Sequence, residues 1–171
     1  MKACGFGGPC GVGKTTLMEG VIHALKAAGQ RVSVVKHADT RFDIDIEGKD
    51  SWRHRQAGAF EVLIASSQRL AKMREFEAEV ALNVHQLLAA LLPCDWALVE
   101  GFKHADLLRV ELWRPGAEPA YPEDPFVVAV ACAEPALLPL PTLRPVFRLE
   151  DALGVAQYLL QHADRFEYDH A

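Results

Sequence analysis

The sequence GPCGVGKT, which runs from Gly8 to Thr15, decides the fold. It fits the pattern G-x-x-x-x-G-K-[ST] at every fixed position. Glycines let the backbone turn tightly, so that several N–H groups converge on one anion without interference from side chains. The segment therefore predicts a loop that holds the phosphates of a nucleotide.

The elements around this loop support the prediction. We expect a strand over 2–6 before the loop and an amphipathic helix over 13–28 after it, ended by Gly29. Such a helix aims its N-terminal N–H groups and its dipole at bound phosphates. Lys14 is expected to contact the β- and γ-phosphates and to act in catalysis, Thr15 to ligate Mg²⁺, and Thr16 to contact the α-phosphate. The other predicted contacts in the loop are Gly8, Cys10, Gly11, Val12 and Gly13.

Strands and helices alternate along most of the remaining chain, and several strands are apolar on both faces. This pattern indicates an α/β fold with a mostly parallel sheet and helices on both faces, as in P-loop NTPases. The hairpin-like segment 60–73 and the strand at 108–113 are expected as antiparallel additions. We expect one domain over 1–171. The other predicted strands are 31–36, 96–99, 126–131 and 145–148, and the other predicted helices are 51–57, 79–92 and 150–162.

A Mg–nucleotide site needs a carboxylate at the end of a neighbouring strand. The apolar run 96–99 leads directly into Glu100, and Gly101 then allows a sharp turn. Glu100 is expected to hold Mg²⁺ through water or to orient the attacking water. The alternative is a surface glutamate at a strand end. Position after a buried strand favours the functional interpretation.

The loop after the second strand is the other expected source of ligands. Asp50 precedes a short helix, so it suits an N-cap and a metal or nucleotide contact equally well. His37 ends the strand on the phosphate side, and the alternative is a hydrogen-bonded structural histidine. Asp43 and Asp45 are expected to be solvated.

Composition excludes several classes of function. The 171 residues carry a net charge of −5 and no cluster of Lys and Arg, which argues against nucleic-acid binding. No apolar run approaches the roughly 20 residues of a membrane span, and no apolar signal segment follows Lys2, so we expect a cytoplasmic protein. The four cysteines form no C-x-x-C pair, so disulfides and structural zinc are not expected.

Four segments together resemble the MobB family of molybdopterin-guanine dinucleotide biosynthesis adaptor proteins. They are GGPCGVGKTTL at 7–17, VVKH at 34–37, GKDSWRHRQAGA at 48–59 and LVEGFKH at 98–104. Their order and spacing extend over the first two thirds of the chain. Two positions depart from the family pattern, because further histidines are absent at 38–40 and Glu47 stands where proline is usual.

The resemblance implies GTP binding with Mg²⁺ and slow hydrolysis. By position, Lys14 and Thr15 would hold phosphate and Mg²⁺, and Asp50 and Glu100 fall in the GKDS and VEGFK segments. The resemblance also implies action beside molybdenum cofactor guanylyltransferase, which joins GMP to the molybdenum-bound pterin, and beside related cofactor-assembly enzymes. It further implies homodimers formed by extension of a sheet.

Two functions stay open on the residues themselves. The first is an adaptor whose loops 38–50 and 101–107 become ordered with GTP and recruit partner enzymes. It would hydrolyse GTP slowly, because none of Arg41, Arg53 and Arg55 is aimed by the sequence at the γ-phosphate. The alternative is a P-loop small-molecule kinase or ATP-dependent ligase with Glu100 or Asp50 as base.

A kinase would need an arginine-rich lid, whereas the segment 114–125 carries only Arg114 and four prolines, which favours the adaptor. The sequence contains no N-K-x-D guanine motif. Guanine preference therefore comes from the resemblance, and we expect 131–140 to contact the base.

Overall fold

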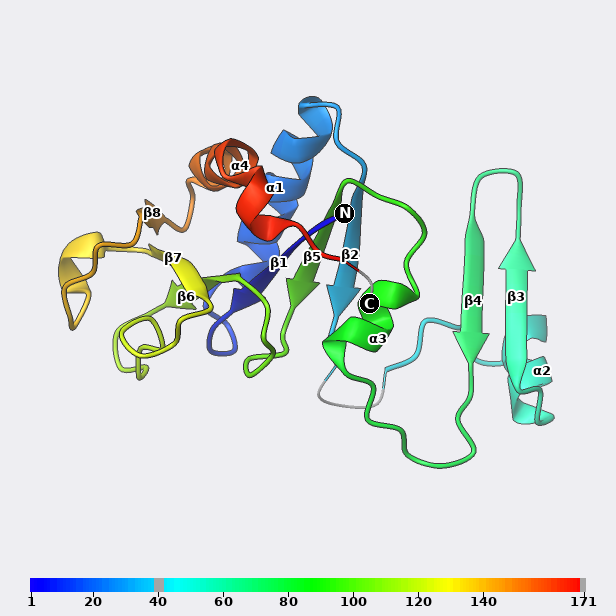
Figure 1. The fold of residues 1–171 in the computed structure, drawn as a ribbon. Helices are drawn as coiled ribbons and strands as arrows, with labels where there is room; N and C mark the ends of the chain where they lie inside the picture. Colours follow the sequence, from blue (N-terminus) through cyan, green and yellow to red (C-terminus); the bar gives the residue numbers. More distant parts are fainter. Residues whose placement is uncertain (39–41, 170–171) are drawn as a thin grey trace. The chain divides into compact units, whose positions relative to one another are not determined.

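The structure is a computed structural model that describes residues 1–38 and 42–169 (Figure 1). Its contacts divide the chain into two compact units, Met1–His37 with Asn83–Ala171, and Ala38–Leu82. The prediction of a single domain over 1–171 stays a prediction. No helix in the described ranges is long and apolar enough to cross a membrane.

The larger unit contains a six-stranded sheet in the order β2-β5-β1-β6-β7-β8, and every pairing in it is parallel. The predicted α/β fold with a mostly parallel sheet is confirmed. Its strands are β1 Lys2–Gly7, β2 Val32–Lys36, β5 Trp96–Glu100, β6 Arg109–Trp113, β7 Val127–Cys132 and β8 Val146–Arg148. Its helices are α1 Lys14–Ala27, α3 Val84–Ala89 and α4 Ala152–Gln161, with short 3-10 turns at Pro135–Leu137 and Ala163–Phe166.

One strand prediction is wrong. The strand expected as an antiparallel addition at 108–113 is β6, which pairs in parallel with both β1 and β7. A parallel neighbour requires a connection that returns the chain to the opposite end of the sheet. The loops 101–108 and 114–126 make these returns without a helix, so the sequence pattern that usually marks a crossover is missing.

The larger unit has helices on both faces of its sheet (Figure 1). α1 and α4 cover one face, where they bury Cys4 and Phe6 of β1 and Val110 and Leu112 of β6. α3 packs on the other face, together with apolar residues of β1, β2 and β5. Because side chains alternate along a strand, β1 contributes to both layers.

α3 is shorter than the predicted helix over 79–92. It begins after Asn83, whose side-chain Oδ1 accepts a hydrogen bond from Gln86 N at 2.9 Å, while Gln86 Oε1 accepts one from Asn83 N at 2.9 Å. This capping box satisfies two N–H groups that begin a helix and so fixes the start of α3. Val80, within the predicted range, lies before the helix and is 51% exposed.

The smaller unit contains α2 Asp50–Gln56, β3 Glu61–Ala65 and β4 Leu70–Arg74. β3 and β4 form an antiparallel hairpin with Glu61 opposite Arg74 and Ala65 opposite Leu70. The predicted hairpin over 60–73 is therefore confirmed.

Candidate nucleotide-binding site

The predicted phosphate loop joins the carboxyl end of β1 to the start of α1. Gly8, Gly11 and Gly13 have φ angles of 143°, 73° and 100°, which side chains other than glycine rarely adopt. At Gly8 a Cβ would also lie 2.2 Å from the carbonyl oxygen of Leu112 on β6. The fixed first and last glycines of the motif are thus required by the shape of the backbone.

The N-terminus of α1 is left open toward this loop. Its N-cap is Gly13, no side chain caps the first turn, and that turn contains no acidic residue. Uncapped N–H groups and the positive end of the helix dipole favour an anion at this position. Val12 is buried in the core, whereas Cys10, Thr15 and Thr16 are exposed.

Lys14 is turned back into the loop. Its Nζ donates to the carbonyl oxygens of Gly8 at 2.9 Å and Pro9 at 2.8 Å. These bonds hold the ammonium group against the backbone that surrounds the expected phosphate position. The loop therefore places a cation beside the uncapped start of α1, which suits a bound polyphosphate.

Glu100 ends β5, the strand beside β1, and joins two other polar side chains. The Thr15 hydroxyl donates to Glu100 Oε1 at 3.3 Å, and the Lys36 Nζ at the end of β2 lies 3.6 Å from Glu100 Oε2. Only 14% of the Glu100 side chain is exposed. The sequence predicted functions for Thr15 and Glu100 separately, and the sheet brings them within one hydrogen bond.

The turn after Glu100 is tightly packed against the end of β2. Gly101 has φ 96°, and a Cβ there would lie 2.8 Å from the Cβ of His37. The next residue, Phe102, also has a positive φ of 52°, and its ring centroid lies 4.8 Å from that of His37. The backbone N–H of His37 donates to the Glu100 carbonyl at 2.9 Å. These contacts fix the position of Glu100, while the predicted cofactor contact of His37 stays a prediction.

Asp50 belongs to the smaller unit. The N-cap of α2 is Lys49 and Asp50 is the first helical residue, so the interpretation of Asp50 as the N-cap is wrong. A carboxylate in the first turn still complements the helix dipole. The predicted metal and nucleotide roles of Asp50 stay predictions.

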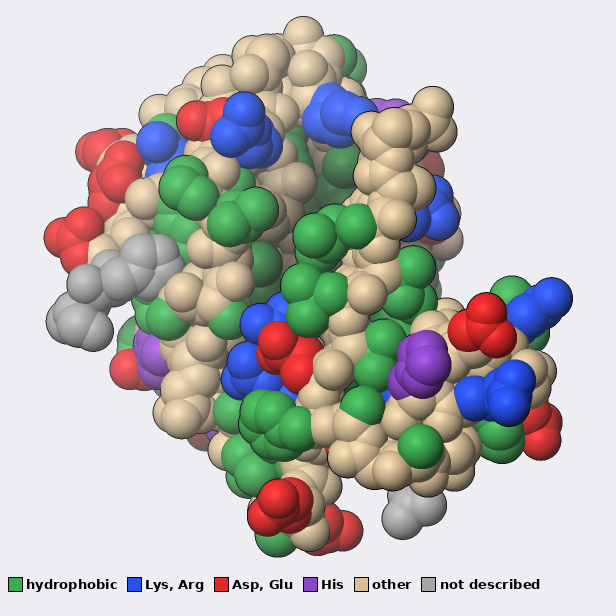
Figure 2. Space-filling view, turned by 90° about the vertical axis from the view of Figure 1, so that its right-hand side faces the viewer, with side chains coloured by type: hydrophobic (Ala, Val, Ile, Leu, Met, Phe, Trp, Pro, Cys, Tyr) green, Lys and Arg blue, Asp and Glu red, His purple; other side chains and the backbone are tan. Residues whose placement is uncertain are grey.

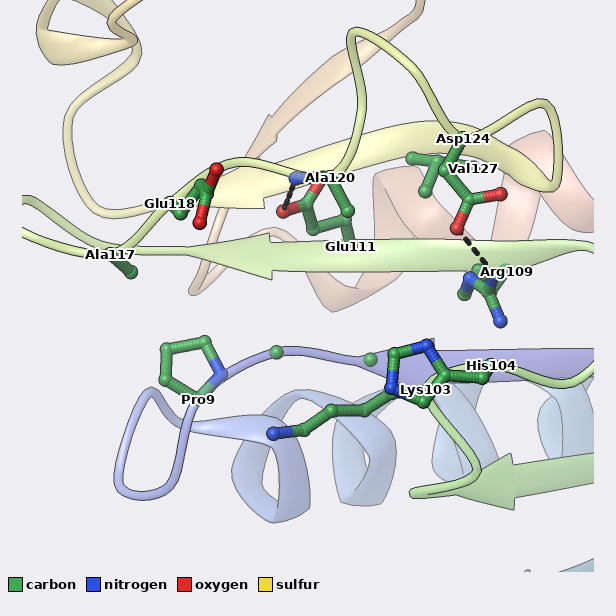
Figure 3. A pocket seen from close by; sticks show the side chains of 12 residues that line it. Pro9, Lys103, His104, Arg109, Glu111, Ala117, Glu118, Ala120, Asp124 and Val127 are labelled. Carbon is green, nitrogen blue, oxygen red and sulfur yellow. Dashed lines mark hydrogen bonds and ion pairs between the residues drawn. The ribbon is translucent and has the colours of Figure 1, made fainter.

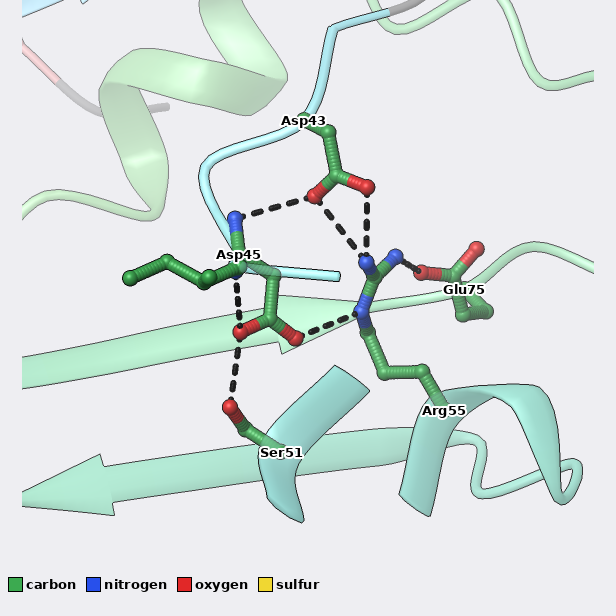
Figure 4. Close-up of polar contacts among 6 residues, drawn as sticks. Asp43, Asp45, Ser51, Arg55 and Glu75 are labelled. Atoms are coloured by element: carbon green, nitrogen blue, oxygen red, sulfur yellow. Dashed lines mark hydrogen bonds and ion pairs between the residues drawn. The ribbon is translucent and has the colours of Figure 1, made fainter. Parts of the chain in front are cut away.

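Arg55 of α2 organises the loop of the smaller unit (Figure 4). Its guanidinium donates to Glu75 Oε1 at 2.7 Å, to both oxygens of Asp43 at 2.9 Å and to Asp45 Oδ2 at 3.2 Å. Ser51 donates to the other oxygen of Asp45 at 2.7 Å. The expectation that Asp45 is solvated is wrong, since its side chain is 5% exposed, whereas that of Asp43 is 52% exposed.

These bonds also engage Arg55, one of the three arginines named as possible partners of the γ-phosphate. Arg55 is occupied by three carboxylates, and the contacts with Glu75 first and then Asp43 raise its pKa further. Hydrogen bonds lower the pKa of Asp43, mainly from the Asp45 backbone N–H, and that of Asp45, mainly from the Ser51 hydroxyl. Arg41, the second arginine considered, lies outside the described residues.

The sequence did not predict the contact of Lys36 with Glu100. The only sequence signal was its place at the end of a strand, next to His37. Pairing of β2 with β5 aligns Lys36 with Glu100, and this pairing depends on the order of strands in the sheet. Among the described residues, no group of three or more His, Cys, Asp or Glu is arranged to hold a metal ion. The predicted metal roles of Thr15 and Glu100 stay predictions.

Comparisons with known proteins agree with this geometry. A family model described as "Molybdopterin guanine dinucleotide synthesis protein B", MobB, matches residues 3–133, well over half of the chain. The chain belongs to the MobB family. The matched residues include the predicted phosphate loop and the segment that contains Glu100.

Curated relatives support the assignment to MobB. A molybdopterin-guanine dinucleotide biosynthesis adapter protein of Escherichia coli is 38% identical over 157 residues, which cover 88% of this chain and 87% of the relative. Its counterpart from Haemophilus influenzae is 40% identical over 132 residues, covering 77% and 74%. The crystal structure of a MobB homologue from Bacillus stearothermophilus has a TM-score of 0.73 and 27% identity, covering 96% of this chain and 99% of that one.

Proposed function

We propose that this protein is a GTP-binding adaptor in molybdenum cofactor biosynthesis, which assists the formation of the guanine dinucleotide on molybdopterin. The observation that carries the nucleotide site is the glycine loop with Lys14 inside it and the Thr15–Glu100 contact of 3.3 Å beside it. Membership of the MobB family and the names of the curated relatives supply the pathway.

The residues present suit Mg²⁺. A threonine hydroxyl and a carboxylate are the hard oxygen ligands that this ion prefers, and phosphate oxygens and waters complete its octahedral shell in such sites. Bound there, Mg²⁺ would neutralise charge on the phosphates. In this proposal Thr15 and Glu100 hold the ion, Lys14 contacts the phosphates, and Glu100 also orients water.

Slow hydrolysis is part of the proposal. Arg55 is held by its own unit, and the segment 114–125 is tied to β6 through bonds from the N–H groups of Ala120 and Tyr121 to Glu111. An arginine near the γ-phosphate is worth about 10³–10⁵ in rate where one is supplied. In this proposal no arginine supplies that contribution, and the protein acts as a nucleotide-dependent adaptor.

The partners in this proposal are molybdenum cofactor guanylyltransferase and a second copy of the chain. Exposed large apolar side chains are frequent in the smaller unit, as expected of an interface. They include Phe42, Ile44, Ile46, Phe60, Leu63 and Leu70, each at least 58% exposed. Figure 2 shows hydrophobic side chains at the surface among charged ones. The cytoplasmic location and the lack of nucleic-acid binding stay predictions.

Calorimetric titration of GTP and ATP, each with Mg²⁺, tests the nucleotide site. We expect tighter binding of GTP than ATP, and Lys14→Ala should weaken GTP binding by about 1.5–3 kcal/mol, the usual worth of a charged hydrogen bond. Lys26→Ala, which removes an exposed lysine from α1, is the matched control. A preference for ATP with rapid phosphoryl transfer to a small acceptor would instead support the kinase or ligase interpretation.

A further inference from the structure

A pocket of about 340 Å³ opens in the larger unit next to the phosphate loop (Figure 3). It is lined by Arg109 and Glu111 of β6. The residues between and after them, Val110 and Leu112, point into the core under α1 and α4. Because side chains alternate along a strand, the pocket lies on the face of the sheet opposite α1. Of the phosphate loop it touches Pro9 and Gly8, which is itself a predicted nucleotide contact, whereas the other predicted contacts in the loop follow at 10–16.

Glycines on β1 make room for the Arg109 side chain in the floor of the pocket, and no helix covers it. On β1, Gly5 and Gly7 present only hydrogen atoms to Arg109, and a Cβ at these positions would lie 3.0 Å from the Arg109 Cβ and 3.6 Å from its Cδ. The connections 101–108 and 114–126, which flank β6, contain no helix to cover this face. The pocket is therefore a consequence of the sequence on three separate segments.

The floor of the pocket is rigid. The Arg109 guanidinium is ion-paired with Asp124 and donates to the Ala105 carbonyl at 2.9 Å. The Glu111 carboxylate accepts from the N–H groups of Ala120 at 2.8 Å and Tyr121 at 2.6 Å. Glu111 is 6% exposed, and this burial raises the pKa of its carboxyl. These bonds fix both connections to β6, so the pocket is formed before any ligand arrives.

The rim of the pocket carries polar side chains that have no partner within the described residues. Lys103 and His104 lie with Pro9 on one side of the pocket, and Glu118 lies on the other (Figure 3). Lys103, His104 and Glu118 are exposed. Across the described residues, none of these three side chains has a hydrogen bond or ion pair. One wall thus offers donors to an anion, and the opposite wall offers an acceptor to an N–H group.

We propose that this pocket is a second ligand site, for a small phosphomonoester that also carries N–H donors. Its phosphate binds between Lys103 and His104, and its N–H groups face Glu118. The volume of about 340 Å³ falls within the range of small-molecule sites. The site is separate from the nucleotide site, and where both are filled the two ligands lie on either side of the backbone at Gly8 and Pro9.

Ligand-observed NMR with 4-aminophenyl phosphate tests this site in the full chain, with excess Mg–GDP to fill the phosphate loop. We expect saturable binding that Lys103→Ala weakens about tenfold, as for loss of one charged hydrogen bond, and that Lys103→Glu abolishes. Lys26→Ala makes the same change of charge on α1 and should leave binding unchanged. Phenyl phosphate, which lacks the amino group, should bind wild type more weakly than 4-aminophenyl phosphate does. Glu118→Ala, which removes the acceptor, should bind the two probes equally.

Two further variants separate this site from the nucleotide site. Ala120→Leu narrows the pocket without changing charge and should weaken the probe, whereas Lys14→Ala should not. Binding that is lost in Lys14→Ala and intact in Lys103→Ala would place the probe on the phosphate loop and overturn the proposal. Lack of saturation, or equal weakening by Lys103→Ala and Lys26→Ala, would overturn it as well. If the protein binds the probe but fails to bind GTP, the proposal of a nucleotide site is refuted and the proposal of this second site is not.

Discussion

At the scale of single residues, the Glu100 carboxylate contacts side chains that follow or end two neighbouring strands. β1 leads into the loop that positions Thr15, β2 ends at Lys36, and β5 ends at Glu100 itself. In the structure Lys36 pairs with the oxygen that Thr15 does not use. A cation held by Thr15 and Glu100 would therefore compete with Lys36 for the same negative charge.

Glu100→Gln should separate metal binding from nucleotide binding. The amide oxygen can still accept the Thr15 hydroxyl, but the charge that attracts a divalent cation is lost. We expect the Mg²⁺ concentration for half-maximal GTP binding to rise at least about tenfold, equivalent to about 1.4 kcal/mol. Glu19→Gln, on the exposed side of α1, is the control. An unchanged Mg²⁺ requirement in Glu100→Gln would remove Glu100 from the metal site.

At the scale of elements, α1 and α4 approach each other closely at one position. Gly20 of α1 faces Ala152 of α4, and a Cβ at Gly20 would lie only 2.4 Å from the Ala152 Cβ. Glycine within a helix costs about 1 kcal/mol relative to alanine. The close approach of the two helices explains why α1 carries glycine here in spite of this cost.

Gly20→Ala should therefore destabilise the protein although alanine is the better helix former. Overpacking of a core costs about 1–3 kcal/mol, which exceeds the gain in helix propensity. Urea unfolding of Gly20→Ala, Ala152→Gly and the double variant measures the coupling between the two positions. We expect the double variant to be more stable than the sum of the single changes predicts. Simple additivity would show that the two helices do not meet as described.

The Arg55 cluster sets the pH dependence of the smaller unit. The pKa values of Asp43 and Asp45 lie below the ordinary 3.8 in the folded protein. The folded state thus binds protons less readily than the unfolded state, so these carboxylates stabilise the fold above pH 3.8. Their contribution is lost as the pH falls through the lowered pKa values.

Arg55→Ala should accelerate hydrogen exchange of the β3 and β4 amides at pH 7, because it leaves Asp45 without its charged partner. The difference from wild type should shrink once the pH falls below 3.8, where protonated carboxyls no longer need the arginine. Arg69→Ala removes the same charge from the hairpin turn, where its side chain has no ion pair in the described parts of the chain. Equal exchange in both variants would contradict a stabilising role for Arg55.

At the scale of the whole molecule, the smaller unit is short of partners for its apolar side chains. An isolated two-stranded hairpin is marginally stable in water, and its outer edges offer unpaired N–H and C=O groups. Leu63 of β3 is 58% exposed and Leu70 of β4 is 64% exposed. A second copy of the chain would cover these side chains, which is the physical basis for the proposed homodimer.

Sedimentation of variants tests this dimer. We expect wild type to sediment as a dimer and Leu70→Lys to shift toward monomer, because a charge at a buried interface costs several kcal/mol unless it is paired. Leu143→Lys, at a fully exposed leucine of the larger unit, should remain dimeric. A monomeric wild type would refute the dimer, and dissociation of both variants alike would exclude the hairpin as its interface.

The sequence by itself determined the phosphate loop, most elements and the fold class, because these depend on local chemistry. Gly8 and Gly13 stand where the backbone needs positive φ, and Lys14 follows at the start of a helix. The apolar strand that ends at Glu100 marked the neighbouring carboxylate in the same local way.

Only the tertiary structure decided which of these residues meet. The parallel pairing of β6, the contact of Lys36 with Glu100 and the pocket beside Gly7 and Gly8 all depend on strand order. Strand order is set by the burial of whole faces and by crossover connections, which leave no fixed spacing in the sequence. Asp45 illustrates the same limit, since its burial depends on an arginine ten residues away on α2. Packing between distant segments therefore brings together Thr15, Lys36 and Glu100, which the sequence alone does not place in contact.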